Sequence, residues 1–217
     1  MIEAVVFDLD GLLLDSEHVW DTAREQLARE RGGRWHERAQ ADMMGMSSPE
    51  WSRYMHDVIG LAEPPEAISA EVVRRLEAIY RDRLPLFPGA REAVERLAAR
   101  WPLALASSSN RPLIDLVLEQ AGLSEFFHTT VSSEEVAHGK PEPDVYLEAA
   151  RRLGVEPTAC AAVEDSRNGI LSAKQAGMRV VAIPNPRYPP DNETLASADA
   201  VLPSLDELAP EVVEAPF

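Results

Sequence analysis

The sequence predicts an α/β fold in which helices cover both faces of a parallel sheet. Short apolar runs that end in a polar residue recur along the chain, and helical patterns separate most of them. This alternation is typical of parallel sheets. A long segment without any strand-like run follows the first strand, which predicts a small all-helical domain inserted there. The expected strands cover residues 4–8, 103–107, 127–132, 161–165 and 179–184.

The expected helices of the sheet domain have recognisable starts and stops. Two of them begin with a proline and end at a glycine, Gly122 or Gly154. Proline is favoured in the first turn of a helix and glycine just after its end. The expected helices cover residues 91–100, 112–122, 143–154 and 168–178, and a final strand and helix follow within 198–208.

Residues 16–85 form the expected helical insert. Their apolar side chains recur at helical spacing, as in Trp20, Ala23 and Leu27. A helical block directly after a strand end is well placed to act as a lid over a ligand. We therefore expect a core domain of residues 1–15 and 86–217, and a cap domain of residues 16–85.

The composition limits the possible partners. The 217 residues include 37 acidic and 21 basic side chains, a formal net charge of −16. Nucleic acids and anionic membranes require a basic face, so neither is an expected partner, and a small anionic substrate would need local positive charge. The N-terminus lacks signal-peptide features, and Cys160 is the only cysteine. We expect a cytoplasmic protein that works as a monomer or a weak homodimer.

Two aspartates stand at the end of the first expected strand. Asp8 and Asp10 point the same way on a strand, roughly 6 to 7 Å apart, and no lysine or arginine lies nearby in the sequence. Ligands of parallel sheets bind at the carboxyl ends of the strands, and Asp165 stands at another such end. Because Mg²⁺ prefers oxygen ligands, these carboxylates predict a divalent-metal site. A structural carboxylate cluster is the alternative.

Two further positions suit an anionic ligand. Ser107 ends the second expected strand, where a hydroxyl and the start of the next helix favour phosphoryl oxygens. The same serine could instead belong to a helix cap that binds no ligand. Lys140 stands in a Gly-Lys-Pro turn and is either a solvated surface charge or the positive charge that an acidic site needs.

Four segments resemble, in order and spacing, the four motifs of the haloacid dehalogenase (HAD) superfamily. They are DLDGLLLDSE (8–17), SSSN (107–110), GKPEPD (139–144) and VEDSRNGI (163–170). The resemblance is greatest for its sugar-phosphate phosphatases and β-phosphoglucomutases, and DGLLLDSEHVWD looks most like 2-deoxyglucose-6-phosphate and hexitol phosphatases. It implies a Rossmann-like core, and a Mg²⁺-dependent phosphatase acting on small phosphorylated sugars or polyols.

The resemblance also implies roles for the motif residues. Asp8 would be the nucleophile that becomes an aspartyl phosphate, and Asp10 the general acid and then the general base. Mg²⁺ would be held by Asp8, Asp165 and the backbone carbonyl of Asp10, with Glu164 adjusting the shell. Family members that cleave carbon–halogen bonds lack the second aspartate, so its presence favours phosphoryl transfer. The implied phosphate ligands are Ser107, Ser108 and Lys140.

The cap is expected to select the leaving group. Mutases of the family carry a histidine at the position of Trp20 and an arginine near that of Ser48, and the absence of both favours hydrolysis. Arg53 could replace the missing charge, which keeps a β-phosphoglucomutase-type mutase as an alternative. A non-catalytic phosphometabolite-binding protein is a further alternative. The candidate specificity residues are Trp20, Gly45, Met46, Ser47, Ser48 and Arg53.

Overall fold

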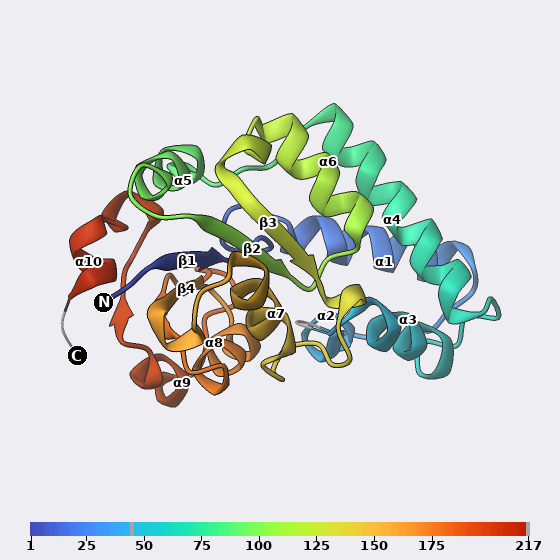
Figure 1. Cartoon of the computed structure of the whole chain (residues 1–217). Coiled ribbons are helices and arrows are strands. Elements are labelled where there is room, and N and C mark those ends of the chain that lie inside the picture. Colours follow the sequence, from blue (N-terminus) through green and yellow to red (C-terminus); the bar gives the residue numbers. More distant parts are fainter. Residues whose placement is uncertain (44–45, 216–217) are drawn as a thin grey trace.

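A parallel sheet lies at the centre of the computed structural model, which describes residues 1–43 and 46–215 (Figure 1). Its strands are β1 (Ala4–Phe7), β2 (Leu103–Ser107), β3 (Phe127–Ser132), β4 (Cys160–Glu164), β5 (Arg179–Ala182) and the short β6 (Ala200–Val201). Their order is β3-β2-β1-β4-β5-β6. The α/β sheet predicted from the sequence is therefore confirmed. β1 lies centrally, with β2 on one side and β4 on the other.

Helices cover both faces of this sheet. They are α5 (Ala90–Ala98), α6 (Arg111–Ala121), α7 (Asp144–Leu153) and α8 (Arg167–Gln175), followed by the short α9 (Asn192–Ser197) and α10 (Pro210–Glu214). Val5 and Phe7 of β1 belong to one apolar cluster with α5 and α6. Ala4 and Val6 point to the opposite face and belong to a second cluster with α7 and α8. Because both faces are covered, β1 is apolar throughout.

Four helices lie between β1 and α5, where the sequence predicts a helical insert. They are α1 (Glu17–Glu30), α2 (Ala39–Met43), α3 (Ser48–Asp57) and α4 (Pro65–Asp82). α4 packs against both α1 and α3, and Figure 1 shows this group on one side of the sheet. The described residues of this segment add no strand to the sheet. No helix in the described part of the chain has the length and apolarity that crossing a bilayer requires.

The chain enters and leaves this helical segment at neighbouring points. The backbone N–H of Asp15 donates to the carbonyl of Pro85 (2.8 Å), and that of Phe87 donates to the carbonyl of Leu13 (3.0 Å). The two crossing segments are thus paired through the antiparallel bridge between Leu14 and Leu86. The helical segment is therefore connected to the backbone of the sheet domain at one place, close to Asp10.

Gly169 allows α8 to approach the end of β4 closely. A β-carbon at position 169 would lie 1.8 Å from Oε1 of Glu164, and Glu164 is fully buried. Such a separation is far below van der Waals contact, so a larger residue would force α8 or the Glu164 carboxylate to move. This glycine therefore maintains the spacing between the helix and the strand end that carries Glu164 and Asp165.

We expect Gly169→Ala to lower the free energy of unfolding by about 1–3 kcal/mol, the usual cost of overpacking a close-packed site. Urea unfolding measures the change. Asn168→Ala is the matched control, because it removes atoms from the neighbouring residue of the same helix turn and is expected to change stability by less than about 0.5 kcal/mol. A Gly169→Ala protein as stable as the wild type would contradict this packing.

Candidate active site

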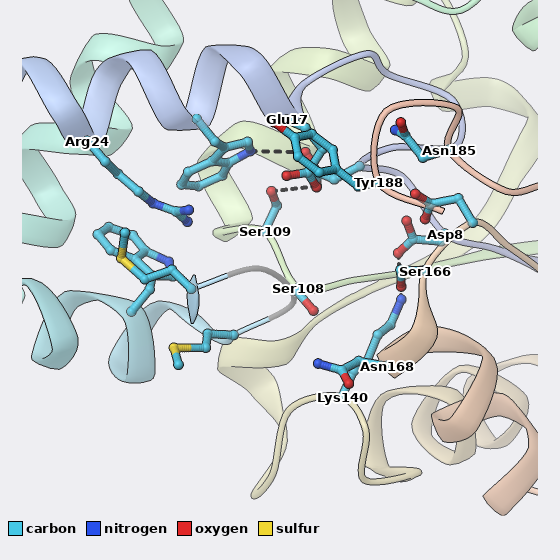
Figure 2. Close-up of a pocket in the computed structure, with 16 residues that line it drawn as sticks. Asp8, Glu17, Arg24, Ser108, Ser109, Lys140, Ser166, Asn168, Asn185 and Tyr188 are labelled. Atoms are coloured by element: carbon cyan, nitrogen blue, oxygen red, sulfur yellow. Dashed lines mark hydrogen bonds and ion pairs between the residues drawn. The ribbon is translucent and has the colours of Figure 1, made fainter. Parts of the chain in front are cut away.

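The site lies at the carboxyl ends of the three central strands. Asp8 directly follows β1, Ser107 ends β2, and Asp165 directly follows β4. The strand order reverses at β1: β2 and β3 lie on one side of it, and β4, β5 and β6 on the other. A crevice is expected at the carboxyl ends of the strands where the order reverses in this way. Lys140 comes from the loop before α7. Figure 2 shows Asp8 and Lys140 on the walls of the pocket at this edge.

Lys140 joins the carboxylates of two different strands. Its Nζ donates to Oδ1 of Asp8 (2.5 Å), to Oε1 of Glu164 (2.6 Å) and to the carbonyl of Ala106 (3.1 Å). The lysine is only 5% exposed, so water screens these charges little and the pairs are stronger than surface salt bridges. The interpretation of Lys140 as a solvated surface charge is therefore wrong: the turn places it inside the site.

Glu164 has no free acceptor position for a further strong ligand. Oε1 accepts hydrogen bonds from Lys140 and from the hydroxyl of Tyr146 (2.6 Å). Oε2 accepts them from the backbone N–H groups of Asp165 (3.0 Å) and Ser166 (3.2 Å). A carboxylate bound in this way orients its neighbours, which agrees better with a supporting role than with direct coordination of an ion.

The burial of this acidic group changes its proton affinity. Burial raises the pKa of Asp8 to about 8, with Lys140 opposing the shift and Glu164 adding to it. Burial, followed by the charges of Glu164 and Asp8, also raises the pKa of Asp165 well above its usual range. Burial alone would lower the pKa of Lys140, but the Asp8 and Glu164 carboxylates raise it above its ordinary value. Burial therefore disfavours the ionised forms of Asp8 and Asp165, and a cation bound beside them would favour those forms again.

The acidic cluster fits a divalent cation bound by Asp8 and Asp165, with Glu164 in a supporting role. Asp8, Glu164 and Asp165 are buried, and one oxygen from each lies within 4.8 Å of the others. Oδ1 of Asp165 has no hydrogen-bond partner among the described residues although it is buried, and such a group requires a ligand to offset its desolvation. Gly11, with a φ of 87°, allows the chain to pass Asp165, because a β-carbon there would lie 2.2 Å from Oδ2. The unpartnered oxygen is the group expected of a metal ligand.

Asp10 contacts groups other than the acidic cluster. Its Oδ1 accepts hydrogen bonds from the hydroxyl of Ser16 (2.7 Å) and the indole N–H of Trp20 (3.2 Å). Its Oδ2 accepts them from the hydroxyls of Ser109 (2.7 Å) and Ser107 (3.3 Å). Asp10 thus connects the start of α1 to the end of β2. Its predicted roles in proton transfer and, through its carbonyl, in metal binding stay predictions.

The three serines at the end of β2 and directly after it are positioned differently. Ser107 is fully buried, and its hydroxyl donates to Asp10 and accepts from the backbone N–H of Ser109 (2.9 Å). Ser108 lines the pocket, and its buried Oγ has no partner in the described part of the chain. Ser109 lines the same pocket and donates to Asp10. Ser108 therefore offers the free hydroxyl, whereas the contacts of Ser107 are within the protein; its assignment as a phosphate ligand stays a prediction.

The candidate specificity residues are divided between two places. Trp20 and Met46 line the pocket over Asp8 and Asp10. The backbone N–H and hydroxyl of Ser47 bind Glu50 (2.8 and 2.5 Å) at the start of α3. Ser48 and Arg53 line a second cavity, beside α4 and the start of α6. Gly45 lies outside the described residues.

Sequence reasoning did not identify Glu17 and Arg24, which also line the pocket. Both come from α1, and with Trp20 they recur at the spacing of one helix face. Charged residues on the apolar stripe of an amphipathic helix are the signal that could have identified them. Burial, followed by the charge of Asp10, raises the pKa of Glu17 to about 7. Tyr188 and Asn168, from segments far away in the sequence, complete the rim (Figure 2).

Comparisons with known proteins identify the family of this chain. Hexitol phosphatase B of Escherichia coli strain K12 is 34% identical, covering 95% of this chain and 94% of its own. The probable pseudouridine-5'-phosphatase of Drosophila melanogaster is 35% identical over 95% and 91% of the two chains. Among solved structures, CbbY from Rhodobacter sphaeroides in complex with phosphate has a TM-score of 0.86 and 28% identity over 98% and 99%. The family model for haloacid dehalogenase-like hydrolases matches residues 2–177. The motif resemblance is therefore confirmed, and this chain belongs to the haloacid dehalogenase-like hydrolases.

Proposed function

We propose that this protein is a Mg²⁺-dependent phosphatase that hydrolyses small phosphorylated metabolites, sugar or polyol phosphates, through an aspartyl phosphate on Asp8. The observation that carries the proposal is the buried contact of Lys140 with Asp8 and Glu164, beside the unpartnered oxygen of Asp165. The relatives whose names specify hexitol, pseudouridine and glycerol phosphates support this substrate class. We further propose that it acts in the cytoplasm.

Asp8 is the group that attacks phosphorus. Lys140 binds Oδ1, which leaves Oδ2 to form the bond to phosphorus while the bond between phosphorus and the ester oxygen breaks. The leaving oxygen takes a proton from Asp10. Water then attacks the aspartyl phosphate and gives a proton back to Asp10, and phosphate and free Asp8 are formed.

The charge of the reacting group is offset from two sides. Lys140 adds one positive charge at the nucleophile, and Ser108 offers a hydroxyl to the phosphoryl oxygens. Mg²⁺, held by Asp8 and Asp165, would supply the remaining positive charge. Glu164 keeps Lys140 in place through its own ion pair.

Residues 16–85 are proposed to form the cap that selects the leaving group, because Trp20 and Met46 from this segment face the pocket. The position of Arg53 gives the mutase alternative no support. Arg53, the residue that could have held a second phosphate in a mutase, lines the second cavity and not the pocket that contains Asp8.

We expect Asp8→Asn to lower kcat by at least about a thousandfold, because the amide is a far weaker nucleophile than the carboxylate. Phosphate release from a panel of phosphate monoesters measures the effect. Asp57→Asn, at an exposed position of α3, is the matched control. Activity that survives in the Asp8 variant would rule out this nucleophile, and a wild type that binds Mg²⁺ but hydrolyses no ester would indicate a binding protein.

Chelation of divalent metal by EDTA is expected to stop hydrolysis, and added MgCl₂ to restore it. Independently of turnover, Mg²⁺ should raise the Tm of the wild type, because a ligand that binds only the folded state stabilises it. Asp165→Asn should weaken Mg²⁺ binding at least about tenfold, whereas Asp57→Asn should leave it unchanged. Full activity in EDTA, together with a Tm that does not respond to Mg²⁺, would refute the metal site.

A further inference from the structure

A buried arginine of the helical segment faces the pocket. Arg24 is 5% exposed, and its guanidinium carbon lies 4.6 Å from the ring centroid of Trp20 and 4.7 Å from that of Trp51. Figure 2 shows its side chain directed from α1 toward the centre of the pocket. The two indoles also contact each other edge to face, with ring centroids 5.8 Å apart, and together they form an aromatic wall beside the guanidinium.

Arg24 has no hydrogen bond or salt bridge with the described residues, and its buried Nε is unpartnered. Removing a guanidinium from water is costly, and the cation–π contacts with the two indoles offset only part of that cost. Burial lowers the pKa of Arg24 to about 10, so the group is still positively charged at neutral pH. A buried charge with unused donors requires an anionic partner.

In the described part of the chain, the carboxylates of Glu17, Asp10 and Asp21 act on Arg24 through space, but none of them is hydrogen-bonded to it. Lys140 is bound to Asp8 and Glu164, so Arg24 is the pocket cation whose donors are unused among the described residues. Glu17 is the nearby carboxylate that acts on Arg24 most strongly, and Gln40 donates a hydrogen bond to Oε2 of Glu17 (3.1 Å). Glu17 and Arg24 therefore interact electrostatically but do not form a direct ion pair.

The position of Arg24 along α1 indicates which part of a substrate it would meet. Trp20 contacts Asp10, the proposed proton donor to the leaving oxygen. Arg24 is four residues further along, so its backbone is about 6 Å from that of Trp20 along the helix axis, and its guanidinium lies over the Trp20 ring, on the cap side of Asp10. A group bound by Arg24 would thus be separated from the ester oxygen by the length of a short carbon chain.

We propose that Arg24 binds an oxyanion at the far end of the leaving group, a carboxylate or a second phosphate. The preferred substrates would then be sugar-acid phosphates or bisphosphates rather than polyol phosphates, whose distal end is uncharged. This inference rests on the proposed phosphatase function and narrows its substrate class. Arg24 serves here as a specificity residue, since it touches the leaving group and not the reacting atoms.

The test compares three six-carbon esters that differ at the distal carbon: sorbitol 6-phosphate, 6-phosphogluconate and sorbitol 1,6-bisphosphate. We expect the wild type to prefer at least one of the two esters with a charged distal group, 6-phosphogluconate or sorbitol 1,6-bisphosphate, over sorbitol 6-phosphate by about tenfold or more in kcat/KM. Arg24→Gln should lower that preference about 10- to 100-fold, the usual effect of losing a charge-assisted hydrogen bond. Whichever anionic ester responds identifies the distal group. Arg29→Gln is the control, because Arg29 lies on the exposed side of α1 and pairs with Glu25.

Equal loss of activity on all three esters in Arg24→Gln, or a wild type that prefers sorbitol 6-phosphate, would overturn the proposal. Calorimetric binding to Asp8→Asn separates it from the proposed function. Even if the wild type hydrolyses none of the esters, Asp8→Asn should bind an ester with a charged distal group more tightly than sorbitol 6-phosphate. Loss of this difference in the double variant Asp8→Asn/Arg24→Gln would support the site. Equal affinity of Asp8→Asn for the esters with an uncharged and with a charged distal group would refute it.

Discussion

The buried ion pairs of Lys140 with Asp8 and Glu164 are the interaction on which the site depends. The lysine contacts the ends of β1 and β4 and also donates a hydrogen bond to Ala106 near the end of β2, so it links the ends of three strands that the backbone ladders already hold side by side. Breaking such a buried pair leaves an uncompensated charge, which is strongly destabilising. The same contact places positive charge beside the proposed nucleophile, so stability and chemistry depend on one ammonium group.

Close backbone approach is the second requirement of the arrangement. A β-carbon at Gly11 would clash with the Asp165 carboxylate, and a β-carbon at Gly169 would clash with the Glu164 carboxylate. Asp10, in turn, connects the sheet to α1 through Ser16 and Trp20. The proposed proton donor is therefore positioned partly by the helical segment, and any movement of α1 relative to the sheet would change the contacts of Asp10.

Much of this arrangement could be predicted from sequence, because it follows from local patterns. The apolar runs before Asp8 and Asp165 define strand ends, and strand ends of a parallel sheet share one edge. The individual contacts could not be predicted, because they depend on tertiary packing between distant segments. Nothing local indicates that Ser107 turns to Asp10 while Ser108 keeps a free hydroxyl. The apolar stripe of α1 could have marked Arg24 as unusual, but its contact with Trp51 could not be predicted, because Trp51 comes from another helix.

Transfer of the phosphoryl group to Asp8 itself can be observed in the first turnover. The experiment mixes the Mg²⁺-loaded enzyme rapidly with an ester that it hydrolyses, quenches with acid and analyses the peptides by mass spectrometry. We expect one phosphoryl group on the peptide that contains Asp8, formed and lost at rates that match turnover. Phosphate release without any modified peptide, or a phosphoryl group on another residue, would contradict it.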